Sequence, residues 1–325
     1  MADVTIAGRF DFGHNSTTTT VGTTATKVST LAGASSGKTS DRLTLKGTEN
    51  LGNGLTAGFE YTVNLTPADT STTGFGGVRE GFLTLGSSTM GTVKIGTQTN
   101  VFDGMVGNGW HNATGVSVSN AVFPSRTTSA INYKTPSFGG LVVGISTMSD
   151  KASVDGVNTV SAEVSGSIID ARYAAGPLSV NFGYGSGKIA TKTVAKIGGY
   201  AGTAYTAVDI KQTSLKASYD VGFAQPYYMY GKGSIDNATQ SAGLKSNEIG
   251  ATFPVGAFTP YFAVSSAKGT GLLNTVKYNA NAIGVDYTIS KRTSAYLTTG
   301  TKKVKVAGVQ EGKVKATAIG LVHTF

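Results

Sequence analysis

The chain has 325 residues, of which 27 are Lys or Arg and 18 are Asp or Glu, so its formal charge is +9 and only 14% of it is charged. Soluble domains usually carry about 25% charged residues, so this chain is unusually poor in charge. It is not strongly apolar either, because only 39% of it is hydrophobic. No run approaches the roughly 20 apolar residues of a transmembrane helix, which excludes a helical membrane protein. Fourteen Tyr and fourteen Phe exclude disorder, and the absence of Cys excludes disulfide scaffolds, thiolate metal sites and Cys nucleophiles.

The first segment predicts a strand with two different faces. Val4, Ile6 and Phe10 lie on one parity and Arg9 on the other, so the pattern directs Arg9 toward a polar interior. The residues after Met1 do not read as a basic and apolar leader. We expect a mature exported chain to which an initiator Met was added; the alternative is a cytoplasmic protein.

Two kinds of break alternate along the rest of the chain. Tight turns are expected at 51–54, 87–91, 136–140, 176–177, 222–225, 254–257 and 290–292, and longer polar breaks near 14–40, 66–76, 99–125, 149–162, 187–206, 234–242, 269–277 and 305–311. Seven turns and eight loops give fifteen connections, hence sixteen strands, although 14 or 18 strands also fit. We therefore expect residues 1–325 to form a single domain, an all-β antiparallel transmembrane barrel with short periplasmic turns and long extracellular loops.

The last strands show the alternation most clearly. Ile283, Val285 and Tyr287 share one parity, with Gly284 and Asp286 on the other. In the final segment one face carries Thr317, Ile319, Leu321, His323 and Phe325. Such strands are typical of a sheet between lipid and water.

Four segments carry a resemblance to a known family: 42–55 (RLTLKGTENLGNGL), 91–96 (GTVKIG), 132–140 (NYKTPSFGG) and 320–325 (GLVHTF). The chain resembles the trimeric general porins of Gram-negative outer membranes, especially the betaproteobacterial branch. It departs from the family at Val322 and Thr97, where relatives often carry Arg.

The resemblance implies a water-filled channel for passive diffusion of small hydrophilic solutes. It also implies a homotrimer in contact with outer-membrane lipid and lipopolysaccharide, a third loop (99–125) folded into the barrel, and Phe325 as an assembly signal. Asp103 is the only ionisable acid of that loop, and Trp110 also lies in it. We expect no enzymatic activity and no cofactor.

A basic wall is expected to face the third loop. Alternation directs Arg9, Arg42 and Lys46 toward the lumen, and Arg79 and Arg126 match family positions that supply wall arginines. A charge on the lipid face would cost about 2–4 kcal/mol. The alternative for each residue is a rim charge that meets lipopolysaccharide or solvent. A basic constriction predicts a preference for small anionic solutes.

Other motifs are weaker. Residues 33–39 resemble a phosphate-binding loop but have Ala32 where that motif needs Gly. His14, His111 and His323 are too far apart in sequence to suggest a metal site, and no recognition helix supports nucleic-acid binding. There are two rival interpretations. A surface adhesin or structural protein should show a fixed repeat, and a barrel enzyme should show a Ser/His or Asp/His pair near one strand end. This sequence shows neither feature.

Overall fold

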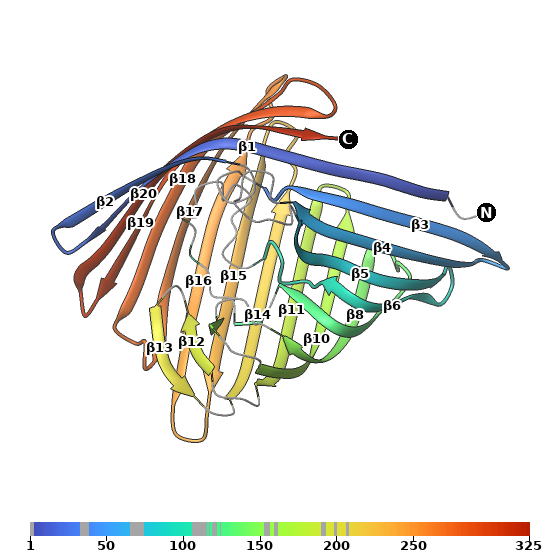
Figure 1. Ribbon diagram of the computed structural model, residues 1–325, viewed down its shortest axis with the longest axis horizontal. Helices are drawn as coiled ribbons and strands as arrows, with labels where there is room; N and C mark the ends of the chain where they lie inside the picture. The colour runs from blue at the N-terminus through green and yellow to red at the C-terminus, as the bar shows by residue number, and fades with distance from the viewer. Residues whose placement is uncertain are drawn as a thin grey trace.

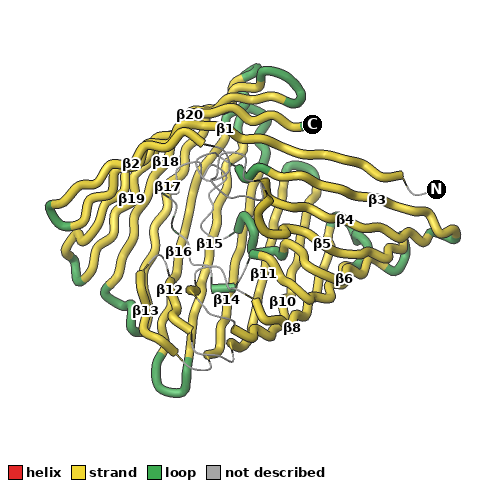
Figure 2. The backbone as a smooth tube through the Cα atoms, viewed as in Figure 1, coloured by secondary structure: helices red, strands yellow, loops and turns green. Residues whose placement is uncertain are grey.

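The computed structural model describes residues 3–32, 39–65, 75–105, 116, 118, 122–123, 125–152, 157–158, 162–189, 193–197, 200–205 and 208–325. Every regular element in these ranges is a β-strand, joined by loops and turns (Figure 2).

Within the described residues, no helix is long and apolar enough to cross a membrane.

Seventeen of the strands belong to one antiparallel sheet. They are β1 (Asp3–Val21), β2 (Thr24–Ala32), β3 (Arg42–Gly52), β4 (Leu55–Leu65), β5 (Phe75–Ser87), β6 (Gly91–Thr99), β7 (Arg126–Lys134), β8 (Leu141–Ala152), β10 (Ala162–Ala175), β11 (Leu178–Ile189), β14 (Val208–Tyr219), β15 (Gln225–Asp236), β16 (Ser241–Thr252), β17 (Phe258–Gly271), β18 (Val276–Thr288), β19 (Thr293–Val306) and β20 (Val309–Thr324). A separate three-stranded sheet contains β9 (Val157–Asn158), β12 (Thr193–Ile197) and β13 (Tyr200–Tyr205).

The sheet closes on itself through β1. On one edge, residues 9–21 of β1 pair with residues 312–324 of β20, so the first and last strands lie side by side (Figure 1). On its other edge, β1 pairs with β3 through residues 3–9 and with β2 through residues 13–21. Because β2 and β3 share one place in the ring, the seventeen strands make sixteen positions, as the turn count predicts.

Carboxylates fill the gap between the end of β2 and the start of β3. The backbone N–H of Asp11 donates to Asp41 Oδ1, and Asp11 Oδ2 accepts from the Thr39 hydroxyl at 3.1 Å. Asp11 Oδ1 also accepts from the Tyr296 hydroxyl at 2.9 Å. Side chains therefore satisfy the backbone where the ladder is interrupted, and they tie β1 to β19 across β20.

Several segments predicted as long loops are strands instead. The expected break at 14–40 contains the second half of β1 and all of β2, and the breaks expected near 234–242, 269–277 and 305–311 shrink to the connections 237–240, 272–275 and 307–308. Thr and Ser in these segments suggested loops. Their cross-strand partners and the β-branched shape of Thr favour extension of the ladder.

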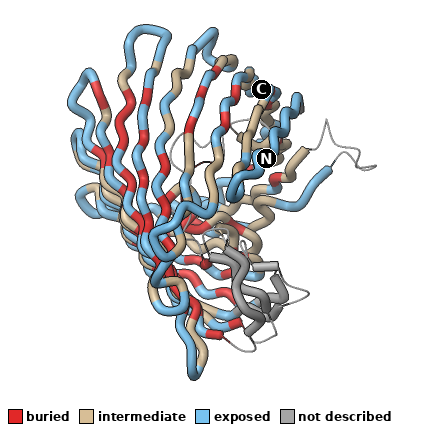
Figure 3. The backbone as a smooth tube through the Cα atoms, turned by 90° about the vertical axis from the view of Figure 1, so that its left-hand side faces the viewer, coloured by how far each residue is buried: buried red, intermediate tan, exposed pale blue. Residues whose placement is uncertain are grey.

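Exposed and buried residues alternate along the strands (Figure 3). In β18, Ile283 and Tyr287 are 61% and 40% exposed and face outward, as predicted. In β16, Leu244, Ser246 and Glu248 are buried on the inner face. The ring thus has an apolar outside, whereas its inside carries both polar and apolar side chains.

Phe325 stabilises the seam, the place where the first strand pairs with the end of the chain. Its backbone N–H donates to Gly8 O at 3.1 Å, and its carbonyl accepts from Gly8 N at 3.0 Å. Its ring stacks on Phe10 with centroids 5.9 Å apart and also covers Gly8. The last residue therefore adds both main-chain pairing and apolar contact to closure.

Deleting Phe325 should lower the yield of folded barrel. The deletion removes two main-chain hydrogen bonds, each worth about 1 kcal/mol, together with the Phe10 contact. Refolding in detergent, followed by unheated gel electrophoresis, measures the folded fraction. Phe325→Tyr keeps both features and serves as the control. Equal folded fractions for the deletion and the control would contradict this role.

Candidate pore constriction

The base of the connection between β6 and β7 is held by polar contacts. Asn100 N donates to Ser125 O at 3.0 Å, which brings the two ends of the loop together. From β5, the Glu80 carboxylate accepts from Thr99 N at 3.0 Å and from the Thr99 hydroxyl. These contacts fix the position at which the loop leaves the barrel wall.

The described part of this loop lies inside the ring. Phe102 and Phe123 are 3% and 0% exposed, and their ring centroids are 5.7 Å apart. Both rings lie against the inner face of β11 at Gly185, where a Cβ would stand 3.0 Å from Phe102 and 3.2 Å from Phe123. The cluster continues to Ile168 on β10 and Ile210 on β14. Apolar residues thus hold the described part of the loop against the inner face of the wall.

Gln212 on β14 holds the far part of the loop. Its Oε1 accepts from the backbone N–H groups of Val122 and Phe123, each at 2.9 Å, and Gln212 is fully buried. One side chain of the wall therefore satisfies two backbone donors of the loop.

Three arginines meet on the wall around Ser40. Arg9 on β1 lies directly opposite Arg42 on β3. Arg9 Nε donates to Ser40 O at 3.1 Å, and Arg79 Nη1 donates to Ser40 Oγ at 3.1 Å and to Asn64 Oδ1 at 3.5 Å. The segment before β3 therefore positions two guanidinium groups.

Arg126, at the start of β7, joins this cluster. The charge of Arg126 acts on both Arg42 and Arg79, and Asp103 and Glu80 also act on both. The charges of Arg42 and Arg79 also act on Arg9, so Arg9, Arg42, Arg79 and Arg126 form one electrostatic group with the loop acid Asp103. We call these four arginines and Asp103 the constriction cluster.

A β-bulge lets Arg79 reach the lumen. Thr62 pairs with Glu80 and Val63 with Val78, so Arg79 has no partner on β4. Regular alternation would place Arg79 on the outer face with Leu83, which is 67% exposed. The extra residue shifts the parity of the strand, so Arg79 and Glu80, although adjacent, both contribute to the inner face.

Lys46 is set apart from the constriction cluster. It is exposed and lies directly opposite Glu60 on the neighbouring strand, so its charge is partly compensated. Glu60 also acts on Arg42. Trp110, His111 and residues 33–38 lie outside the described residues.

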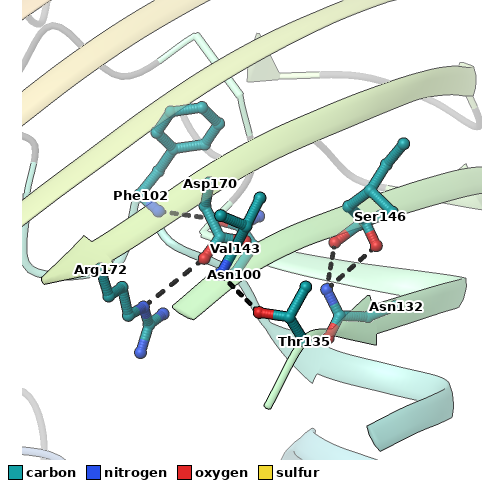
Figure 4. A network of polar contacts seen from close by, with 9 residues as sticks. Asn100, Phe102, Asn132, Thr135, Val143, Ser146, Asp170 and Arg172 are labelled. Atoms are coloured by element: carbon teal, nitrogen blue, oxygen red, sulfur yellow. Dashed lines mark hydrogen bonds and ion pairs between the residues drawn. The ribbon is translucent and has the colours of Figure 1, made fainter. Parts of the chain in front are cut away.

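Sequence reasoning missed a second basic group on the inner wall. Lys134 on β7 interacts electrostatically with Arg172, Asp170 and Lys94. Arg172 Nε lies 3.6 Å from Asp170 Oδ2, and these two side chains extend from β10 beside the base of the loop (Figure 4). Alternation could have found these positions, because Lys94 and Lys134 flank the outward residues Ile95 and Tyr133.

A closed antiparallel ring with a loop packed inside it and arginines facing that loop is the architecture of an outer-membrane channel protein. A family model described as Gram-negative porin matches residues 1–307, and the chain belongs to this family.

Individual relatives agree with this assignment. Outer membrane porin protein 32 of Delftia acidovorans is 28% identical over 207 residues, which cover 58% of this chain and 53%, about half, of the relative. The anion-selective porin from Comamonas acidovorans superposes with a TM-score of 0.78 at 22% identity over 100% of both chains. OmpT of Vibrio cholerae in its trimer form gives a TM-score of 0.71 at 13% identity, over 100% of this chain and 99% of that one. These structural likenesses show a shared fold.

Replacing Gln212 by Met should loosen the inward loop. The substitution keeps the side-chain length but leaves two buried N–H groups without their acceptor, at a cost of about 1–3 kcal/mol each. Single-channel recordings should show a larger and more variable conductance. Ser214→Ala, on the same inner face, is the control. Wild-type conductance and noise in Gln212→Met would show that this anchor does not hold the loop.

Proposed function

We propose that the chain forms a water-filled pore in the outer membrane through which small hydrophilic solutes diffuse passively, with a preference for anions. The observation that carries the proposal is the constriction cluster, in which four arginines face a loop whose single ionisable acid is Asp103. Such a pore sorts solutes by size and charge and requires neither a catalytic residue nor a cofactor.

Carboxylates near the cluster reduce its positive charge. Asp11 and Asp41 act on Arg9 but are fully buried, whereas the four arginines are only partly buried, so positive groups reach the pore in excess. Glu80 is bonded to Thr99 at the loop base, and Glu60 lies opposite Lys46. Arg79 and Arg126 are only partly buried. A guanidinium group has five N–H donors, so the part of each group that is open to the pore can donate to a passing anion.

Electrostatics in a narrow pore amplify this surplus. Two unit charges about 4 Å apart interact by roughly 1 kcal/mol in bulk water and by about 4 kcal/mol where the effective dielectric constant is near 20. Low-dielectric walls also focus the field and raise the local concentration of the opposite ion. The name of the solved anion-selective porin from Comamonas acidovorans agrees with this direction.

The channel should therefore favour chloride over potassium. In a planar bilayer with a gradient of dilute KCl, the reversal potential of the wild-type protein should have the sign of an anion-selective pore. Replacing Arg42, Arg79 and Arg126 together by Ser should reduce that preference severalfold, and 1 M salt should weaken it because the screening length falls to about 3 Å.

The control for this experiment is Arg292→Ser, which removes a positive charge from an exposed turn between β18 and β19. Its reversal potential should match that of the wild type. A wild-type channel that prefers potassium at low salt would overturn the proposal and would make Glu60, Glu80 and Asp286 the groups to test next.

The protein is further proposed to assemble as a homotrimer surrounded by outer-membrane lipid and lipopolysaccharide. The trimer form of OmpT supports this arrangement. The exposed outer residues Ile6, Leu83 and Leu85 suit burial against lipid or a second copy of the chain. Light scattering in detergent should give three times the mass of one chain, and a monomer mass across detergents would contradict the trimer.

A further inference from the structure

A second group of charged side chains lies on the inner wall, away from the constriction cluster. It contains Lys94 on β6, Lys134 on β7, and Asp170 and Arg172 on β10, and we call it the turn-side cluster. On β7, Lys134 ends the strand that Arg126 of the constriction cluster begins. At about 3.3 Å per residue the two positions are roughly 26 Å apart along the strand. The two clusters are therefore separate places in the pore.

The turn-side cluster faces the lumen. On β6 and β7, the residues that face outward are Ile95 and Tyr133, which are 56% and 37% exposed. On β10 they are Ile169 and Tyr173, which are 50% and 37% exposed. The four charged residues occupy the alternate positions of the same strands, so they point into the pore.

The cluster lies just beyond the inward loop, on the side of the short turns. Val101 of the loop lies against Gly183 on β11, where a Cβ would stand 2.5 Å from it. The next inward residue of β11 toward the turn at 176–177 is Asn181, and it pairs with Arg172. A solute that has passed the loop therefore meets this part of the wall next.

Gly144 makes room for the carboxylate of the cluster. Lys134, Gly144 and Asp170 lie directly opposite one another on β7, β8 and β10. Because Gly144 has no side chain, Asp170 Oδ1 reaches over β8, where a Cβ at position 144 would collide with it. Asp170 Oδ2 lies 3.6 Å from Arg172 Nε. The carboxylate thus lies between the two cations and positions them.

Arg172 offers the remaining side of its guanidinium group to the pore. Its side chain is 45% exposed, whereas that of Asp170 is 4% exposed. The Nε atom faces Asp170, and the terminal nitrogens extend away from it (Figure 4). These terminal N–H groups form the fork that can donate two parallel hydrogen bonds to one oxyanion.

Two ammonium groups flank this fork. Lys94 pairs with Asn132, so it lies diagonally from Lys134, at a Cα separation of about 7–8 Å. Both lysines are partly exposed. Lys94 Nζ lies 4.3 Å from the centroid of the Phe82 ring, which holds it against the wall. One small anionic group can therefore lie within reach of Arg172 and of a lysine at the same time.

The cluster has a surplus of positive charge. Three cations surround one carboxylate, which leaves a formal charge of about +2. The cross-strand row continues from Arg172 through Asn181 to Lys216 on β14, where Glu248 acts on Lys216. That pair adds no net charge. A surplus of two charges favours a doubly charged anion over a singly charged one, because the Coulomb energy scales with the product of the charges.

We propose that the turn-side cluster is a second anion site of the pore and that it binds doubly charged oxyanions, such as sulfate or the phosphate group of a phosphate monoester. The inference deepens the proposed function and rests on it, because these anions must enter the pore. The fork of Arg172 selects an ion with paired oxygens, and the charge surplus selects a dianion. Chloride has neither property and passes the site.

The test measures how sulfate blocks the chloride current in a planar bilayer with dilute KCl. Sulfate should reduce the wild-type conductance at concentrations at which nitrate, a singly charged oxyanion, does not. Glycerol 3-phosphate at pH 8, where its phosphate is doubly charged, should block at a concentration within about threefold of that for sulfate. A monoester that does not block would overturn the assignment to phosphate esters.

Single variants locate the block. Arg172→Gln should raise the half-blocking concentration of sulfate about tenfold, and Lys134→Gln about threefold, because each removes charge-assisted donors. Arg172→Lys keeps the charge beside Asp170 but lacks the fork, so it should fold and still raise the value about threefold. The matched control is Lys302→Gln. Lys302 is a partly exposed lysine on β19 that shares the parity of buried Thr298, so this change removes one positive charge from the inner wall elsewhere. It should leave the value within about 1.5-fold.

Two results would overturn the second site. An equal rise in Lys302→Gln and Arg172→Gln would show that sulfate responds only to the total charge of the pore. Block that survives Arg172→Gln and Lys134→Gln, but is lost when Arg42, Arg79 and Arg126 are replaced by Ser, would assign sulfate to the constriction cluster alone.

A crystal of the wild-type protein soaked in selenate gives a readout that does not depend on current. Its anomalous peak should lie within hydrogen-bond distance of the terminal nitrogens of Arg172. An anion-selective channel without this peak contradicts only the second site, whereas a peak in a protein that prefers potassium contradicts the proposed function.

Discussion

A bilayer offers no water to the edge of a strand, so a sheet that spans it must pair its first strand with its last. Here that requirement is met by β1 and β20, and the interruption between β2 and β3 is bridged by Asp11 and Asp41. Closure gives each strand one face toward the lumen and one face toward the lipid. The inward loop, the arginine wall and the outward lysines all follow from which side of this ring a residue occupies.

Strand register then separates two kinds of positive charge. Inward arginines gather around Ser40 and the loop, where neighbouring carboxylates moderate them, whereas outward lysines meet other lysines. A shift of one residue would exchange the two faces. The bulge at Arg79 is a local use of that rule, since one unpaired residue turns a lipid-facing position into a lumenal one.

The count of turns and loops predicted the strand number, and alternation predicted the outward face at Ile283 and directed Arg9 and Arg42 inward, because each depends only on local pattern. Arg79 was found by family position, since a bulge is invisible to a strict two-residue period. The anchor from Gln212 joins residues 89 and 90 apart in the chain, and no local signal marks it. The Thr-rich stretch 17–20 was predicted as a loop from its composition. Its pairing partners lie in β2 and in β20 at the far end of the chain, and no local signal marks that pairing.

The closing pair is also staggered. Thr324 pairs with Arg9 and Phe325 with Gly8, so β1 continues for five residues, Asp3 to Ala7, past its last partner at the end of the chain. A stagger at the seam means that the strands run obliquely to the barrel axis, and the tilt sets the circumference that a fixed number of strands can enclose. Because a slip of one residue would turn the sheet inside out, the stagger can change only in steps of two. The diameter of the backbone ring can therefore take only certain values. Substitutions of lumenal side chains can narrow or widen the open pore, but they do not change the diameter of the ring.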